Sequence, residues 1–260
     1  IPANNPYVIN TNQLLDELGY DYYLFETTGQ KPEYSSKRFL DFLPQLASSD
    51  SKRCKSLADA RLYKHQELAY QVLARGENLV LKSGTGSGKT ESWFLYMALH
   101  RKKVLAIYPT LALANDQVTR LREYCMALGL KALAIDAMKK SEMIKRSGLR
   151  EVRMEIESSD LIITNPALLL NEVKKISLGQ SSLLKSFIMR AGLMVVDEFD
   201  FYGPRSIALL LSMLRMIIKL VNSRLQLTIM TAALQNPEEV AKIITGINSL
   251  STSIVDGKPF

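Results

Sequence analysis

From Leu57 onward, short runs of apolar residues alternate with longer amphipathic segments, and this alternation constrains the fold more than any other feature of the sequence. Apolar runs of this length predict strands, and the segments between them predict helices. The predicted strands are residues 78–81, 104–108, 132–135, 161–164, 193–196 and 226–230. Strands that alternate with helices pair into a parallel sheet that is covered by helices on both faces. The predicted fold class is therefore α/β, with a doubly wound parallel sheet.

The composition of the 260 residues supports a folded protein and excludes several other classes. Hydrophobic residues make up 47% and charged residues 23%, which is unlike a disordered, collagen-like or low-complexity chain. The longest apolar stretch, residues 207–221, contains Arg215 and Lys219 and is shorter than the roughly 18 to 20 clean apolar residues of a membrane span. We therefore expect no membrane partner.

The charge balance and the small number of cysteines favour an intracellular protein with an anionic partner. Lysine and arginine total 33 against 26 acidic residues, a formal net charge of +7, which favours nucleic acid or phosphate groups as partners. Two cysteines, Cys54 and Cys125, are too few for a disulfide framework or a four-cysteine zinc site. We expect a reduced, cytoplasmic location.

The pattern divides the chain into two regions. Residues 1–56 carry no recognisable motif and are predicted to be an N-terminal extension of unknown role, whereas residues 57–260 carry the α/β pattern. Within the second region, apolar residues recur at helical spacing over residues 111–128, which places Cys125 in the core. Residues 138–157 are dense in both charges and predict a solvated helix, with a nucleic-acid-binding patch as the alternative.

A glycine-rich segment with the sequence Ser-Gly-Thr-Gly-Ser-Gly-Lys-Thr occupies residues 83–90, directly after the first predicted strand. Between a strand and a helix, such a loop wraps phosphates with its backbone N–H groups and with the helix N-terminus. Lys89 would then reach the β and γ phosphates, and the Thr90 hydroxyl would hold Mg²⁺. The predicted phosphate-binding residues are Gly84, Thr85, Gly86, Ser87, Gly88, Lys89 and Thr90. The alternative is a glycine-rich turn that binds no nucleotide.

A second chemical element follows the fifth predicted strand, where residues 197–200 read Asp-Glu-Phe-Asp. Phosphate chemistry needs a metal ligand and a group that orients water. Asp197 is predicted to hold the Mg²⁺ shell, and Glu198 to position and deprotonate the attacking water. Asp200 is predicted to link this loop to neighbouring elements. We predict that the catalytic residues are Lys89, Asp197 and Glu198.

The glycine-rich loop, the acidic box and further strings resemble, in their order, the first RecA-like domain of a superfamily 2 DExD/H-box helicase. The resemblance covers residues 57–260 and implies a RecA-like P-loop NTPase fold and an ATP-dependent helicase that uses ATP and Mg²⁺. Residues 62–66 resemble the Q motif of this family, which implies that Gln66 reads the adenine edge and that Tyr63 packs on the base. The alternative for this short string is a plain helix start.

Other strings resemble the family's nucleic-acid motifs. Residues 108–117 resemble motif Ia and residues 164–167 resemble motif Ib, and the two motifs grip the sugar-phosphate backbone of the tracked strand. The residues that this resemblance assigns to the strand are Thr110, Leu111, Thr164 and Asn165. Ordinary connections between strands and helices are the alternative for both strings.

Residues 231–233 stand where the family carries Ser-Ala-Thr, so Thr231 is expected to couple the acidic box to the nucleic-acid grip. Ala233 lacks the second hydroxyl of that motif, and Phe199 stands where the family's box usually has a small residue. These two departures affect the details of coupling.

Within the family, the strings resemble RecQ-related DNA repair helicases that carry a cysteine-rich C-terminal domain, or CRISPR-associated helicases, so DNA is the preferred partner. RNA helicases, an ATP-gated nucleic-acid clamp and a P-loop enzyme outside the helicases remain alternatives. The sequence contains no recognisable second RecA-like domain, which in the family supplies arginine fingers. Because such a finger contributes roughly 10³ to 10⁵ in rate, we expect the isolated domain to bind ATP weakly and to hydrolyse it slowly.

Overall fold

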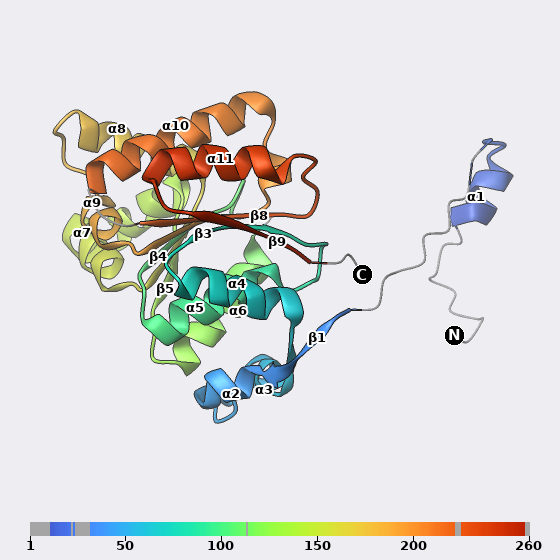
Figure 1. Cartoon of the computed structure of the whole chain (residues 1–260). Coiled ribbons are helices and arrows are strands. Elements are labelled where there is room, and N and C mark those ends of the chain that lie inside the picture. Colours follow the sequence, from blue (N-terminus) through green and yellow to red (C-terminus); the bar gives the residue numbers. More distant parts are fainter. Residues whose placement is uncertain (1–10, 22, 24–31, 113, 222–224, 258–260) are drawn as a thin grey trace. The chain divides into compact units, whose positions relative to one another are not determined.

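A parallel sheet of seven strands, in the order β5-β6-β4-β7-β8-β3-β9, lies between layers of helices within residues 31–260 (Figure 1). The computed structural model describes residues 11–21, 23, 32–112, 114–221 and 225–257. The strands are β3 (Asn78–Lys82), β4 (Val104–Ile107), β5 (Ala132–Ala134), β6 (Leu161–Thr164), β7 (Leu193–Val196), β8 (Gln226–Thr231) and β9 (Thr252–Asp256). All six predicted strands are present with ends shifted by one residue at most. The edge strand β9 was not predicted.

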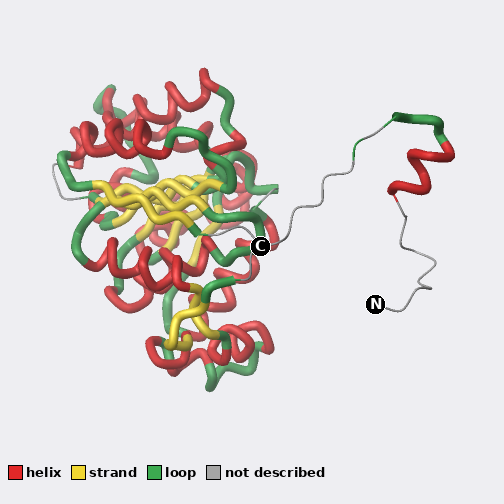
Figure 2. The backbone as a smooth tube through the Cα atoms, turned by 45° about the vertical axis from the view of Figure 1, so that its right-hand side comes forward, coloured by secondary structure: helices red, strands yellow, loops and turns green. Residues whose placement is uncertain are grey.

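Helices cover both faces of the sheet, which confirms the doubly wound α/β fold (Figure 2). One face carries α4 (Lys64–Ala74), α5 (Lys89–His100) and α6 (Asn115–Ala127). The other face carries α7 (Ala137–Ser158), α8 (Pro166–Ser177), α9 (Lys185–Arg190), α10 (Pro204–Val221) and α11 (Pro237–Asn248).

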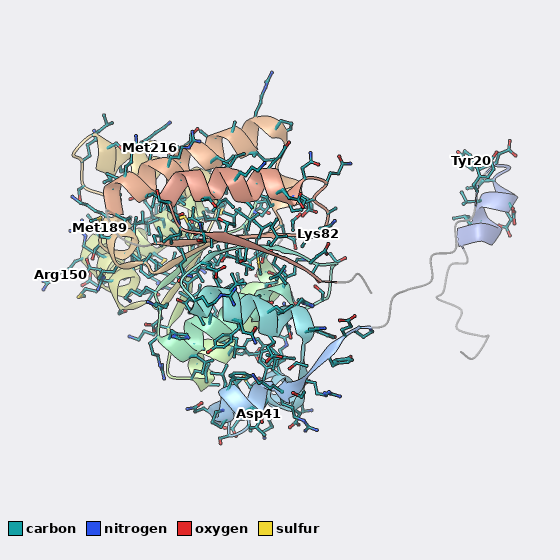
Figure 3. The ribbon with its side chains drawn as sticks, viewed as in Figure 1. Tyr20, Asp41, Lys82, Arg150, Met189 and Met216 are labelled. Carbon is teal, nitrogen blue, oxygen red and sulfur yellow. The ribbon has the colours of Figure 1, made fainter. Side chains whose placement is uncertain are left out.

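Each face of the sheet packs against its helices in a separate hydrophobic core, and successive residues of a strand point into opposite cores. In β3, Leu79 and Leu81 belong to the core beside α4, α5 and α6, and Val80 belongs to the core on the other face. Side chains fill the space on both sides of the sheet (Figure 3), and Lys82, which is labelled there, is the last residue of β3.

The N-terminal part of the chain joins the sheet domain earlier than expected. Contacts divide the chain into residues 1–30, which include α1 (Thr11–Glu17), and residues 31–260. The predicted boundary after Ser56 falls inside α3 (Lys52–Asp59). Before α3 the second unit contains β1 (Tyr34–Arg38), α2 (Phe39–Phe42) and the short 3-10 helix η1 (Pro44–Leu46), and β1 pairs with β2 (Arg61–Tyr63).

Phe39, Leu46 and Cys54 belong to the same hydrophobic core as α4, α5 and α6. Residues 34–56 are therefore built into the sheet domain.

The two longest predicted helical segments are present with differences in detail. The first, α6, begins at Asn115 rather than at residue 111, and Cys125 is buried within it; burial raises the pKa of this thiol to about 12, so Cys125 is a core residue. The charged segment forms α7, whose helical backbone is interrupted at Gly148. Most of α7 is exposed, as a solvated helix requires. Among the described helices, none has the length and apolar character to cross a bilayer.

Candidate active site

The glycine-rich loop lies between the carboxyl end of β3 and the first turn of α5. Ser83 N donates a hydrogen bond to Thr231 O at 3.0 Å, which ties the start of the loop to the neighbouring strand β8. Gly86 and Gly88 have φ values of 77° and 73°, a left-handed conformation that strongly favours glycine. Helix α5 starts at Lys89 without a side-chain cap, so the first amides of the helix are available to an anion.

The Lys89 side chain closes over this loop. Its Nζ atom donates to Ser83 O at 2.9 Å and to Gly84 O at 3.1 Å, and the side chain is almost fully buried. Thr90, the next residue, makes a long contact of 3.4 Å between its Oγ1 atom and Gln117 Oε1. The ammonium and the hydroxyl thus both lie at the glycine-rich loop, and their contacts with phosphate and metal stay a prediction.

The acidic box follows β7, which lies two strands from β3 in the sheet. Asp197 N donates to Ile107 O at 2.9 Å, and Asp197 Oδ1 accepts from Glu198 N at 2.8 Å. The side chain of Asp197 is 1% exposed, and burial raises its pKa to about 6 against the opposing effects of the Tyr108 phenol, the Glu198 amide and the Lys89 ammonium. Glu198 has a φ of 51°, a strained conformation for a residue other than glycine.

One cavity of about 760 Å³ joins the two elements. Lys89 and Thr90 line it from the loop, and Asp197 and Glu198 line it from the acidic box. The other predicted cofactor residues that line it are Tyr63, Gln66, Thr85, Gly86 and Gly88. Gly84 and Ser87 do not line the cavity. Gly84 O accepts from Lys89 Nζ, and the Ser87 side chain is buried, with its carbonyl oxygen 2.9 Å from His65 Nε2.

Gln66 contacts the glycine-rich loop directly. Its Oε1 atom accepts from Tyr63 N at 2.9 Å, and its Nε2 atom donates to Gly88 O at 2.9 Å. The first of these bonds caps the start of α4, so residues 62–66 do form a helix start. The second bond places Gln66 against the loop, and reading an adenine edge would require an exchange of one bond. The role of Gln66 in base recognition stays a prediction.

The donor atoms at the site fit a magnesium ion. No group of three or more metal-ligating His, Cys, Asp or Glu side chains occurs among the residues that the structure describes. Mg²⁺ usually takes only one or two carboxylates together with waters and phosphate oxygens. Asp197 Oδ2 is a buried carboxylate oxygen without a hydrogen-bond partner in the described structure, and the Thr90 hydroxyl makes a long contact with Gln117. Thr90 and Asp197 are therefore suitable ligands for this ion.

The sequence matches the family model of the DEAD/DEAH box helicases over residues 63–240, which is more than half of the chain and includes both the loop and the acidic box. The chain belongs to the DEAD/DEAH box helicase family. Its sheet and flanking helices are accordingly a RecA-like helicase fold.

Known helicases resemble this chain over most of its length. An uncharacterized ATP-dependent helicase of Methanocaldococcus jannaschii is 28% identical over 208 residues, 75% of this chain and 29% of that protein. An ATP-dependent DNA helicase of Thermoplasma acidophilum is 26% identical over 189 residues, 70% of this chain and 25% of that protein. A crystal structure of the DUF1998 helicase MrfA bound to DNA has a TM-score of 0.71 at 20% identity and covers 96% of this chain and 35% of that one. The chain thus spans about a quarter to a third of the length of these helicases.

The nucleic-acid residues expected in this helicase domain lie outside the cavity. Thr110 is exposed and Leu111 half-buried in the connection after β4, whereas the Thr164 side chain is fully buried at the end of β6. Asn165 Oδ1 accepts from Leu168 N at 2.9 Å and so caps α8. Contacts with a nucleic-acid strand stay a prediction for all four residues.

The two predicted coupling residues of the helicase domain touch each other. Asp200 Oδ1 accepts from Thr231 Oγ1 at 2.9 Å and from Ala232 N at 3.1 Å. Asp200 is the last residue of the acidic box and belongs to η2 (Phe199–Phe201), and Thr231 ends β8. The contact that coupling needs is present, and the coupling role stays a prediction.

Sequence reasoning missed several residues of this helicase site. Tyr34 and Arg61 line the cavity from β1 and β2, and the rings of Tyr34 and Tyr63 stack with centroids 5.1 Å apart. Arg120 Nη1 of α6 lies 3.0 Å from Oε1 of the buried Glu91, directly after Thr90. These contacts join residues 29 positions apart in the chain, and no local pattern indicates them. Tyr108 could have been found from the sequence, because it is the first residue of the string that resembles motif Ia.

Proposed function

We propose that this chain is the first motor domain of an ATP-dependent helicase or translocase that moves along a single strand of nucleic acid, with DNA preferred over RNA. The observation that carries the proposal is the meeting of Lys89 and Thr90 with Asp197 and Glu198 around one cavity at the carboxyl ends of β3 and β7. Ligands of open α/β sheets bind at this edge. The DNA-bound MrfA structure and the DNA helicase of Thermoplasma acidophilum support DNA.

The residues divide the chemistry of ATP hydrolysis among them. The amides of the loop and the Lys89 ammonium hold the phosphates, and Gln66 and Tyr63 hold the base. Thr90 and Asp197 hold Mg²⁺, which neutralises charge on the phosphate oxygens when bound. Glu198, half-buried at the cavity, orients a water and accepts its proton as the water oxygen attacks the γ phosphorus and the bond to the β-phosphate oxygen breaks.

A second RecA-like domain completes the site in this proposal. It supplies arginine fingers, and the motif Ia and Ib loops with Thr110, Leu111, Thr164 and Asn165 grip the strand as the two domains close and open. The hydrogen bond between Thr231 and Asp200 couples a conformational change of the acidic box during ATP hydrolysis to the end of β8. Without that second domain, the chain holds ATP weakly and turns it over slowly, because the stabilisation of the transition state is incomplete.

The test compares Glu198→Gln with the exposed control Glu238→Gln in a protein that contains both motor domains. We expect DNA-stimulated ATP hydrolysis in the parent and the control, and Glu198→Gln should keep ATP binding but lose turnover by at least about a hundredfold, as loss of a general base does. The 260-residue chain alone should hydrolyse ATP slowly, and DNA duplexes should be unwound in preference to RNA duplexes.

Normal unwinding by Glu198→Gln would contradict the role of this residue. An ATPase rate of the isolated chain equal to that of the two-domain protein would contradict the need for a second domain. ATP binding without productive turnover in the parent would favour the clamp interpretation.

A further inference from the structure

Tyr108 lies beside the candidate metal site, and the proposed hydrolysis of ATP gives this residue no role. It directly follows β4, and its backbone N donates to Thr164 O at 2.9 Å. Strands β4 and β7 pair in register with Ile107 opposite Val196, so Tyr108 lies level with Asp197, one residue beyond that pair. Because side chains alternate along a strand, both side chains point to the face of the sheet that α5 covers.

The polar ends of these two side chains are buried without hydrogen-bond partners. Among the described residues, neither Tyr108 Oη nor Asp197 Oδ2 has a partner, and each side chain is 1% exposed. The two groups are nevertheless close neighbours, because the Asp197 carboxylate and the Thr90 hydroxyl are both polar side chains that act on the Tyr108 phenol. A phenol carries an O–H group that can donate a hydrogen bond, so Tyr108 offers a donor next to both suitable metal ligands.

An unpaired buried hydroxyl is costly, and phenylalanine would fill the same space without that cost. The cost is offset if the hydroxyl is paired in another state of the site. Carboxylates that hold a metal are usually themselves hydrogen-bonded, and such bonds fix their orientation. Asp197 Oδ1 already has the Glu198 amide, so Oδ2 is the atom that lacks a fixed partner.

We propose that Tyr108 is a positioning residue of the nucleotide site, whose phenol donates a hydrogen bond to Asp197 Oδ2 when Mg²⁺ and ATP are bound and so orients the carboxylate toward the metal. This inference rests on the proposed function. Tyr202 Oη is also unpartnered near Asp197, but Tyr202 directly follows the acidic box on the same loop. Tyr108 comes from a neighbouring strand and provides a reference that is independent of that loop.

The test measures how the affinity for a fluorescent ATP analogue depends on Mg²⁺ concentration. Wild type and Tyr108→Phe should bind the analogue equally in EDTA, because the phosphate cradle is intact. With Mg²⁺ added, Tyr108→Phe should need at least about tenfold more metal for the half-maximal gain in affinity, because losing a hydrogen-bond partner of a metal ligand typically weakens metal binding by that much. Tyr202→Phe should keep the wild-type dependence.

The matched control is Tyr96→Phe, which removes an equally buried phenol that donates to Gln226 Oε1 at 2.7 Å, away from the site. Tyr96→Phe should keep the wild-type Mg²⁺ dependence and have a lower Tm. Without ligands, Tyr108→Phe should have a Tm no lower than wild type, because no hydrogen bond is lost. A merely structural role would instead lower the Tm and leave the Mg²⁺ dependence unchanged.

A wild-type Mg²⁺ dependence in Tyr108→Phe would overturn the inference, and so would a weakened Mg²⁺ dependence in Tyr202→Phe alone. Absence of analogue binding by the wild-type chain, with or without Mg²⁺, would instead overturn the proposed function. The two failures are thus distinguishable in one set of titrations.

Discussion

Glu172 shows how a single buried charge connects elements that the sheet does not connect. This residue of α8 is fully buried, and its Oε1 atom accepts from Lys140 Nζ at 2.8 Å and from Lys175 Nζ at 3.0 Å. Its Oε2 atom accepts from Ser182 Oγ and from Leu183 N, both at 2.8 Å. Burial alone would raise the pKa of Glu172, but these hydrogen bonds outweigh it and lower the pKa to about 2.

Replacing Glu172 by glutamine should therefore destabilise the domain in a pH-dependent way. The folded-state pKa lies below the ordinary value of 4.5, so the stabilisation is complete above about pH 5 and is lost as the pH falls toward 2. We expect Glu172→Gln to reduce the free energy of unfolding by on the order of 2 kcal/mol at pH 7. The difference from wild type should shrink by more than half at pH 3.

Urea unfolding at the two pH values measures this difference, with Glu142→Gln on the exposed face of α7 as the control. The control should differ little from wild type at either pH. A constant deficit of Glu172→Gln across pH would show that the carboxylate charge is not what stabilises this cluster.

At the residue scale, the placement of the candidate site residues was predictable from short, local strings. Lys89, Thr90, Asp197 and Glu198 were each predicted in a segment that follows a strand, and all four line one cavity. The environment of each group was not predictable. The pKa of Asp197 and the unpaired Tyr108 hydroxyl depend on which side chains of other elements surround them, and those neighbours are distant in the chain.

At the scale of elements, the glycine-rich loop and α4 form one unit. A Cβ atom at Gly88 would lie 2.3 Å from Gln66 Nε2, whereas one at Gly86 would meet no atom within 4 Å. Gln66 cannot withdraw without losing its bonds to Tyr63 N and to Gly88 O. A methyl group at Gly88 would therefore displace Gln66, whereas one at Gly86 would displace no neighbour, although both glycines have a left-handed backbone.

We expect Gly86→Ala to lower the free energy of unfolding by about 1 to 2 kcal/mol, the ordinary cost of a left-handed backbone at a residue with a side chain. Gly88→Ala pays the same cost and also displaces Gln66, so it should lose about 1 to 2 kcal/mol more. Urea unfolding of the nucleotide-free chain measures both values, and Gly86→Ala is the matched control. Equal destabilisation by the two variants would contradict the tight contact between Gln66 and the loop.

The elements that sequence patterns missed are short and polar. Strand β9 runs through Thr252–Asp256, and only Val255 of its five residues is buried, because the strand lies at the edge of the sheet. Strands β1 and β2 have five and three residues, and each has one buried residue. Such strands carry little hydrophobic periodicity, and only their pairing partners define them. The six other strands of the seven-stranded sheet, by contrast, are mostly apolar and buried, and they were predicted.

At the scale of the whole molecule, the region before the predicted boundary contributes to the site. Tyr34, Lys52 and Arg53 line the same cavity as the glycine-rich loop. Arg53 Nη1 lies 3.1 Å from Glu123 Oε1, which connects α3 to α6. The sequence pattern located the α/β repeat but could not indicate this packing, because it depends on contacts across about 70 residues of chain.

The most direct test of the account is calorimetric titration of the 260-residue chain with ATP in the presence of Mg²⁺, comparing wild type, Lys89→Ala and the exposed control Lys102→Ala. The loop and the acidic box can act together only if a triphosphate occupies the cavity between them. We predict weak, saturable, one-to-one binding by wild type and by the control, and loss of binding in Lys89→Ala. Binding of Lys89→Ala with wild-type affinity, or no binding by wild type, would contradict the account.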